Sequence, residues 1–152
     1  MMYCRGFQIN GKASDRAECS GKKALNPWGC TDYLNQKKKI LETGADVYEL
    51  MNDYPVHTKA VLINDRLSVV GSYNLDMRST YLDTELMLVI DSEKLSQQIH
   101  ETESDYMEKS KEVLANGQET EGAKYQGKVL NRKKKLYYGV LRIIIRPLRQ
   151  LL

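Results

Sequence analysis

The sequence has few of the residues that build disulfide frameworks, zinc sites or membrane spans. It holds three cysteines among 152 residues, an odd number without Cys-x-x-Cys spacing. Neither a disulfide framework nor a zinc site is expected, and a reducing cytosolic setting is the default. No run of about twenty apolar residues is present, so no transmembrane span is predicted. The N-terminus is too polar for a secretory signal.

The chain as a whole also lacks a large excess of charge of either sign. With 23 basic and 20 acidic residues the net charge is +3, which does not indicate a nucleic-acid partner. Hydrophobic residues make up 41% and charged residues 28%, as in a globular protein with a polar surface. The length is enough for one ordinary domain.

Histidine occurs at only two positions, His57 and His100. His57 is followed two residues later by Lys59, and on an extended chain such residues share a face. This pair suits an anion, because the lysine supplies a fixed positive charge and the imidazole can attack or transfer protons. His100 has no lysine two residues later. We interpret it as an ordinary surface residue.

The stretch after the histidine–lysine pair predicts a β-hairpin. Residues 60–64 and 67–72 are mainly apolar and would pair as strands across a turn at Asp65 and Arg66. A third apolar strand would follow, carrying one acid, Glu85. A nucleophilic histidine needs its other ring nitrogen held by an acceptor. Glu85 is the best candidate for that acceptor.

A second polar pair follows the hairpin. Ser72 and Asn74 also lie two residues apart, and Gly71 beside them removes a side chain where a ligand needs backbone access. Both pairs would converge at one end of the hairpin. This predicts a phosphate pocket with His57 as nucleophile and Lys59 as charge clamp. Ser72 and Asn74 would add neutral hydrogen-bond donors.

The combination of these residues at fixed spacing resembles the HKD motif of the phospholipase D superfamily, H-x-K-x4-D-x6-G-[SG]-x-N. The residues in register with it are His57, Lys59, Gly71, Ser72 and Asn74. Further along, the chain looks like the later repeat of bacterial cardiolipin synthases. The positions that carry this second likeness are Leu75, Asp76, Met77, Arg78, Ser79 and Glu85. The resemblance extends over about residues 25–152.

One position departs from the motif. The family aspartate falls on Asn64, and the aspartate comes one residue late, at Asp65. Asparagine keeps the shape and some hydrogen bonding but loses the charge. On a strand, a shift of one residue faces the other way, so Asp65 is not expected to replace it. The resemblance implies a supporting role here, which we assign to Asn64, Asp65 and Gly71.

The resemblance implies phosphodiester chemistry in two steps on a phospholipid of the phosphatidylglycerol type. His57 would attack phosphorus to give a phosphohistidine, while Lys59 and Asn74 hold the non-bridging oxygens. An alcohol or water would then displace the histidine. No metal and no organic cofactor is implied.

The family builds its site from two HKD motifs, and the second histidine acts as general acid. This chain has one motif. A symmetric homodimer, a partner chain carrying the other motif, or an inactive fragment would each account for that. Likeness to the later repeat favours a truncated or split cardiolipin synthase.

Two other functions stay open. One is a single-motif homodimeric nuclease of the phospholipase D type, although the acids Asp76, Asp83 and Glu85 near the site disfavour nucleic acid. The other is a catalytically silent, membrane-associated interaction module, which Asn64 and the missing motif would fit.

The predicted fold is α/β, a mixed sheet with flanking helices that forms one phospholipase D-like repeat, plus a C-terminal basic amphipathic helix. The expected divisions are a poorly ordered lead at 1–24, the repeat at 25–117, a linker at 118–131 and a membrane-surface segment at 132–152. Within the repeat we expect a helix from Thr31 or Asp32 to Leu41, a strand at 45–50 and a long helix at 93–115.

The last segment carries seven basic residues and no acid between many apolar ones. A basic amphipathic segment with tyrosines lies on an anionic membrane surface. The chain would then be peripheral, on the cytoplasmic face. The alternative is a helix packed on the protein's own core. Pro147 should bend or end it.

Overall fold

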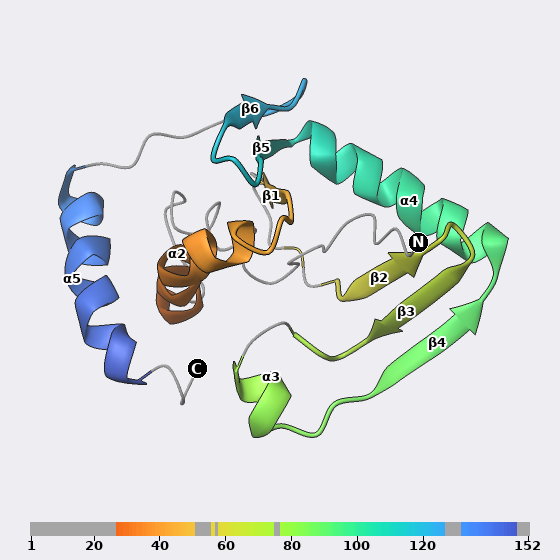
Figure 1. Cartoon of the computed structure of the whole chain (residues 1–152), viewed down its shortest axis with the longest axis horizontal. Helices are drawn as coiled ribbons and strands as arrows, with labels where there is room; N and C mark the ends of the chain where they lie inside the picture. The colour runs from red at the N-terminus through yellow and green to blue at the C-terminus, as the bar shows by residue number, and fades with distance from the viewer. Residues whose placement is uncertain (1–26, 51–55, 57, 75–76, 127–131, 149–152) are drawn as a thin grey trace.

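Two three-stranded antiparallel sheets, each flanked by helix, make up the part of the chain that the structure describes (Figure 1). The computed structural model describes residues 27–50, 56, 58–74, 77–126 and 132–148. In chain order the elements are α2 (Pro27–Leu41), β1 (Val47–Leu50), β2 (Ala60–Ile63), β3 (Leu67–Gly71), α3 (Met77–Tyr81), β4 (Met87–Asp91), α4 (Glu93–Glu108), β5 (Ser110–Val113), β6 (Glu119–Glu121) and α5 (Arg132–Leu148).

The first sheet, in the order β2-β3-β4, confirms the predicted hairpin. Ala60 pairs with Val70 and Ile63 with Leu67. The turn between the strands holds Asn64 and Asp65 at φ of 53° and 54°. Few side chains tolerate that left-handed backbone, and asparagine and aspartate are among them.

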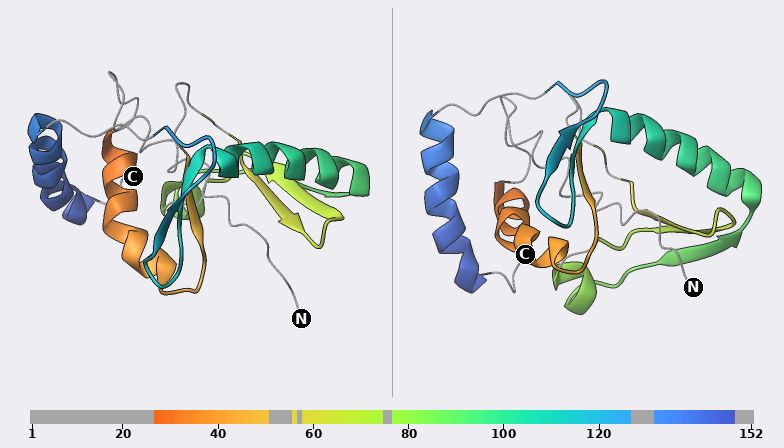
Figure 2. Two further views of the ribbon diagram at one scale, coloured as in Figure 1. Left: turned by 90° about the horizontal axis from the view of Figure 1, so that it is seen from above. Right: turned by 45° about the horizontal axis from the view of Figure 1, so that its top comes forward.

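Helix α4 lies along one side of this sheet (Figures 1 and 2). It begins at Glu93, the predicted start, and is capped by Ser92, whose Oγ accepts from Leu95 N at 3.3 Å. Ser68 of β3 and Ser96 of α4 are both buried and share a hydrogen bond of 2.9 Å between their hydroxyls. This bond gives each of the two buried hydroxyls a partner.

The predicted helix at 93–115 is wrong in its last third. Helix α4 ends at Glu108, and β5 pairs with β1 so that Val47 lies opposite Val113. Both valines are buried. A pairing between residues more than 60 positions apart thus overrides the local helical periodicity of this stretch.

Strand β6 pairs with β5 and completes the second sheet, in the order β1-β5-β6. The hairpin turn uses Gly117 at φ +83°, a conformation that glycine adopts without a steric penalty. Residues 119–121 were expected in the linker but belong to a sheet. The predicted α/β class with flanking helices is confirmed, and the described strand pairings are all antiparallel.

Helix α2 begins at Pro27, four residues before the predicted cap. Thr31 and Asp32 are buried inside the helix and do not cap it. Proline is favoured in a first helical turn because its missing N–H has no partner there in any case. The predicted end is confirmed, since Gly44 has φ +84° and its N–H donates to Leu41 O at 3.0 Å.

The C-terminal helix α5 packs against α2, at the far side of the molecule from β2-β3-β4 (Figures 1 and 2). Its buried residues are Tyr138, Leu141 and Ile145, and Leu34 of α2 packs against them. Arg142 Nε donates to Asn35 Oδ1 at 3.0 Å, and Asn35 Nδ2 donates to Arg142 O at 3.2 Å. One face of the predicted membrane segment therefore packs on the protein itself.

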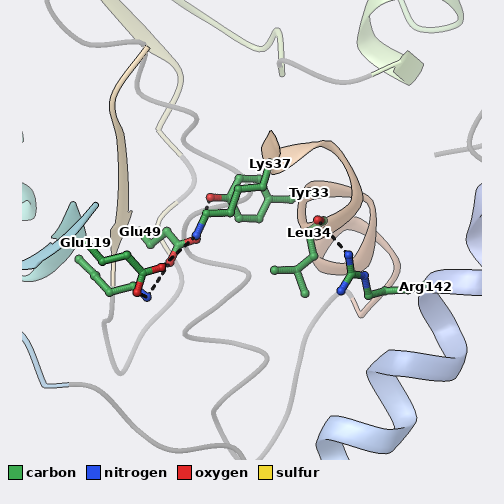
Figure 3. A network of polar contacts seen from close by, with 7 residues as sticks. Tyr33, Leu34, Lys37, Glu49, Glu119 and Arg142 are labelled. Atoms are coloured by element: carbon green, nitrogen blue, oxygen red, sulfur yellow. Dashed lines mark hydrogen bonds and ion pairs between the residues drawn. The ribbon is translucent and has the colours of Figure 1, made fainter. Parts of the chain in front are cut away.

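A buried carboxylate ties α2 to the second sheet (Figure 3). Glu49 of β1 is 0% exposed and accepts from Tyr33 Oη at 2.9 Å and Lys37 Nζ at 2.8 Å. Lys111 Nζ lies 3.7 Å from its other oxygen. Glu119 contacts both lysines, at 3.6 and 2.6 Å. A charge removed from water persists only when it is paired in this way.

Replacing Glu49 with alanine is expected to lower the free energy of unfolding by about 3–5 kcal/mol, because two lysines lose their buried partner. Urea unfolding followed by circular dichroism measures this. The matched control is Glu42→Ala, whose ion pair with Lys38 is exposed. That change should stay below about 1 kcal/mol. Equal effects of the two substitutions would show that the buried network contributes no more than a surface pair.

Candidate active site

The open end of the β2–β3 hairpin brings three of the predicted site residues together. Gly71 N donates to Lys59 O at 3.2 Å, which fixes the backbone of the lysine beside the end of β3. Ser72 follows directly, and its N–H donates to Leu86 O at 3.0 Å. The lysine, the serine and the segment before β4 therefore meet at one edge of the sheet, as the hairpin predicted.

Gly71 is required by the backbone of the neighbouring strand. A Cβ atom at this position would lie 2.1 Å from Leu86 O and 2.9 Å from Met87 Cα. No flexible side chain can move aside, because both atoms belong to the main chain. The sequence suggested that the glycine leaves room for a ligand, but its space is taken by the approach to β4. This close approach is what carries Glu85 to the site.

Glu85 lies two residues before β4, not inside the strand as predicted. The Ser72 hydroxyl donates to Glu85 Oε2 and accepts from Leu86 N, the latter at 3.1 Å. Hydrogen bonds from Ser72 and then Ser79, with a smaller contribution from the charge of Lys59, lower the pKa of Glu85 below its ordinary value. The carboxylate is thus held in its charged form.

Asn74 reaches the same group of residues through α3. Its Nδ2 lies 3.4 Å from the Ser79 hydroxyl, with the nitrogen as donor. The short helix is secured by Tyr73 to Thr80 at 2.9 Å and by Arg78 to Asp83 at 2.9 Å. Sequence reasoning gave Ser79 no role. Its only signal was its place in the run that resembles cardiolipin synthases.

His57 lies outside the described residues, but residues on either side of it are placed. Val56 is buried and packs against Leu50, with Tyr106 of α4 beside them. Thr58 is exposed and Lys59 is half-buried. The chain is thus described directly before and directly after this position.

Asn64 and Asp65 are separated from this site. Both are exposed in the turn at the opposite end of the hairpin from Lys59 and Ser72. Side chains do not alternate between two faces there, because neither residue belongs to a strand. Their shared left-handed backbone is a structural requirement of the turn, which asparagine and aspartate both meet.

The arrangement offers a cation, an amide and a fixed carboxylate around one exposed edge. Lys59 and Asn74 can donate to the oxygens of a phosphate, while Glu85 accepts only. Among the described residues, no group of three histidine, cysteine, aspartate or glutamate side chains is placed to hold a metal. The pKa of Glu85 favours a carboxylate that orients a neighbouring proton donor.

A second candidate surface is the outward face of α5. Its exposed apolar residues are Leu136, Tyr137, Val140, Ile143, Ile144 and Leu148. The same helix carries Arg132, Lys133, Lys135, Arg142 and Arg146 among its exposed residues, and no acid. None of the helices described is long and apolar enough to cross a bilayer.

Comparison with known proteins gives the site a family context. Residues 19–105, more than half of the chain, match the family described as cardiolipin synthase, PLD-like domain. The match begins at residue 19, so it overlaps the last residues of the segment 1–24 that was predicted to be a poorly ordered lead. It includes Lys59, Ser72, Asn74, Ser79 and Glu85, together with the position of His57.

Individual relatives carry the same name. The chain is 37% identical to cardiolipin synthase A of Proteus mirabilis over 94 residues, 62% of this chain and 19% of the relative. It is 37% identical to cardiolipin synthase A of Buchnera aphidicola over 108 residues, 71% of this chain and 21% of the relative. The chain thus spans about a fifth of the length of the curated relatives it matches. No solved structure matches it.

Proposed function

Since the chain belongs to the PLD-like domain family of cardiolipin synthases, we propose that it transfers phosphatidyl groups between phosphatidylglycerol-like lipids through a phosphohistidine at His57. The observation that supports this most is the convergence of Lys59, Ser72 and Glu85 at one end of the hairpin. Asn74 joins them through Ser79. The position of His57 is two residues from the lysine.

In the first step an imidazole nitrogen of His57 forms a bond to phosphorus. The bond from phosphorus to the oxygen of the headgroup glycerol breaks. The leaving oxygen takes a proton from the histidine of a second HKD motif. Lys59 and Asn74 donate to the non-bridging oxygens, where negative charge develops. Glu85 holds the other side of the imidazole.

In the second step the hydroxyl of another phosphatidylglycerol attacks the phosphohistidine. The bond from nitrogen to phosphorus breaks, and the second histidine takes the proton of the attacking hydroxyl. Two lipids thereby give one cardiolipin-type product and free glycerol. In this proposal, a dimer mate or a partner chain would supply the second motif.

The C-terminal helix places this chemistry at a lipid surface. We assign its exposed apolar face to the acyl boundary and its basic residues to anionic headgroups. The chain would be peripheral, on the cytoplasmic face. The opposite face stays on α2, so α5 would bind lipid as a docked part of the fold.

Transfer on phosphatidylglycerol vesicles tests the proposal, with cardiolipin-type product measured by mass spectrometry. We expect product from the wild-type chain at its dimer mass and none from His57→Ala. A further test mixes equal amounts of wild type and His57→Ala and lets the dimers re-equilibrate. If each dimer needs both histidines, the mixture should keep about a quarter of the activity of wild type at the same total concentration, since about a quarter of random dimers carry both. About half would indicate two independent sites. Product formation that survives His57→Ala would contradict the proposal.

A further inference from the structure

We infer that Ser72 is a positioning residue that sets the direction of the Glu85 carboxylate, so that its hydroxyl serves the carboxylate and not the phosphate of the substrate. The sequence predicted Ser72 as a neutral donor to the phosphate. In the folded chain its hydroxyl is bonded to the segment before β4. The catalytic meaning of this contact rests on the proposed function, while the contact itself is a property of the folded chain.

The hydroxyl of Ser72 has one proton, and the proton is taken by Glu85. Ser72 Oγ donates to Glu85 Oε2, and a charged carboxylate has no proton to give in return. Leu86 N donates to the same serine oxygen at 3.1 Å. The oxygen then has only lone pairs to offer, which cannot bond to a phosphate oxygen because both are acceptors. Lys59 and Asn74 carry the N–H donors that a phosphate needs.

The serine side chain also takes the place of a ladder acceptor where the pairing of β3 with β4 ends. The residue after the last paired position of β3 is Ser72, which lies opposite Leu86. Ser72 N donates to Leu86 O at 3.0 Å, as in a hydrogen-bonded antiparallel pair. In such a pair the return bond goes to the serine carbonyl, but here Leu86 N donates to Oγ. Ser72 therefore holds both the carboxylate of Glu85 and the main chain directly after it.

These bonds orient Glu85 relative to the cation of the site. A free glutamate side chain samples many rotamers, and a bond to its carboxylate removes that freedom. The hairpin end that carries Ser72 is itself fixed, because Gly71 N donates to Lys59 O at 3.2 Å. The hydrogen bond from Ser72 is also the largest of the causes that lower the pKa of Glu85. One serine thus controls the direction of the carboxylate and favours its charged form.

The Ser72→Ala substitution removes the donor to Glu85 and the acceptor of Leu86 N. A carboxylate that loses a donor is less stable in its charged form, so the pKa of Glu85 should rise toward its ordinary value. Ser72→Thr keeps a hydroxyl and should keep the wild-type titration. The charge of Lys59, which also acts on Glu85, is the same in all of these variants.

A carbon NMR titration of the Glu85 carboxyl in the purified chain measures this change. The control is Ser104→Ala, whose exposed hydroxyl donates to His100 O on α4. We expect an upward shift in Ser72→Ala and none in Ser72→Thr or the control. If Ser72→Ala does not fold, Ser72→Cys carries the test, and its weaker donor should give a smaller rise. An unchanged Glu85 titration in the folded variant would overturn the inference.

A double-mutant cycle in the transfer assay shows whether the serine acts through Glu85 or on the phosphate. Ser72→Ala should lower kcat about 10-fold or more, the lower end of the loss seen when a group that orients a catalytic ligand is removed. In the Glu85→Ala background the same substitution should cost less than about twofold, because no carboxylate is left to position. Losses that multiply in the double variant would mean that Ser72 contacts the phosphate, which contradicts the inference.

The two measurements separate this inference from the proposed function. If the chain catalyses no transfer but the Glu85 titration shifts as expected, Ser72 positions the carboxylate and the proposed function fails. If the chain catalyses transfer and the titration is unchanged in a folded Ser72→Ala variant, the proposed function stands and the positioning role fails.

Discussion

Replacement of Lys59 with alanine is expected to lower phosphatidyl transfer about 10²–10³-fold, as when a donor to a developing charge is removed elsewhere. The loss should fall mainly on kcat, because the phosphate oxygens gain negative charge as the transition state forms. The backbone of Lys59 is already fixed by Gly71, so the change should leave the fold intact. Steady-state kinetics on mixed lipid–detergent micelles measure the effect.

Lys38→Ala is the matched control for this prediction. Lys38 is an exposed lysine of α2 that pairs with Glu42 on its own helix, and its loss removes the same charge from the chain. It should change transfer less than about twofold. A comparable loss in both variants would mean that net charge on the lipid surface limits the reaction, not the phosphate contact of Lys59.

The double substitution Leu136→Glu and Ile143→Glu is expected to weaken binding to phosphatidylglycerol vesicles about 100-fold or more. Both side chains lie on the outward face of α5, 72% and 71% exposed, so the contact of this helix with α2 should survive. Each loses the free energy of burying an apolar side chain in the acyl boundary and adds a charge of the wrong sign. Vesicle co-sedimentation measures the change.

The double substitution Leu82→Glu and Val89→Glu is the matched control for this prediction. Leu82, which follows α3, is 63% exposed, and Val89 of β4 is 69% exposed. Neither belongs to α5, and the change in net charge is the same. Their binding should stay close to wild type. In addition, wild-type binding should fall as salt rises, because the cations of α5 act on headgroups through screened charge. Equal losses in the two double variants would contradict the assignment of α5 as the lipid-binding helix.

The local part of the site could be predicted from sequence because its geometry depends on short spacing. The hairpin, the pairing of Lys59 with the end of β3, and the place of Ser72 all follow from residues within fifteen positions of each other. Turn chemistry limited the prediction at Asn64. The left-handed backbone of Asn64 belongs to the hairpin turn, a feature that the motif spacing does not indicate, and its supporting role in the site stays a prediction.

The missed elements depend on contacts between distant residues. Strand β5 was assigned to a helix because its periodicity is ambiguous, and only its pairing with β1 decides the matter. The burial of Glu49 likewise needs lysines from α2 and β5.

The C-terminal helix packs on the protein with one face and leaves a second apolar face exposed. Its all-basic charge and apolar content favour a lipid surface, and packing on the protein is the alternative. The structure divides the helix, with Tyr138, Leu141 and Ile145 on α2 and a separate apolar face exposed. Sequence periodicity alone could not separate these two stripes, because apolar residues occur nearly all around the helix.

The covalent intermediate is the most direct test of the account. The wild-type chain is incubated with short-chain phosphatidylglycerol, denatured at alkaline pH to preserve phosphohistidine, and mapped by mass spectrometry. The account predicts a phosphatidyl adduct on the peptide that contains His57, absent in His57→Ala and reduced in Lys59→Ala. An adduct on another residue, or none in a chain that binds the lipid and turns it over, would contradict the assignment of His57 as the nucleophile.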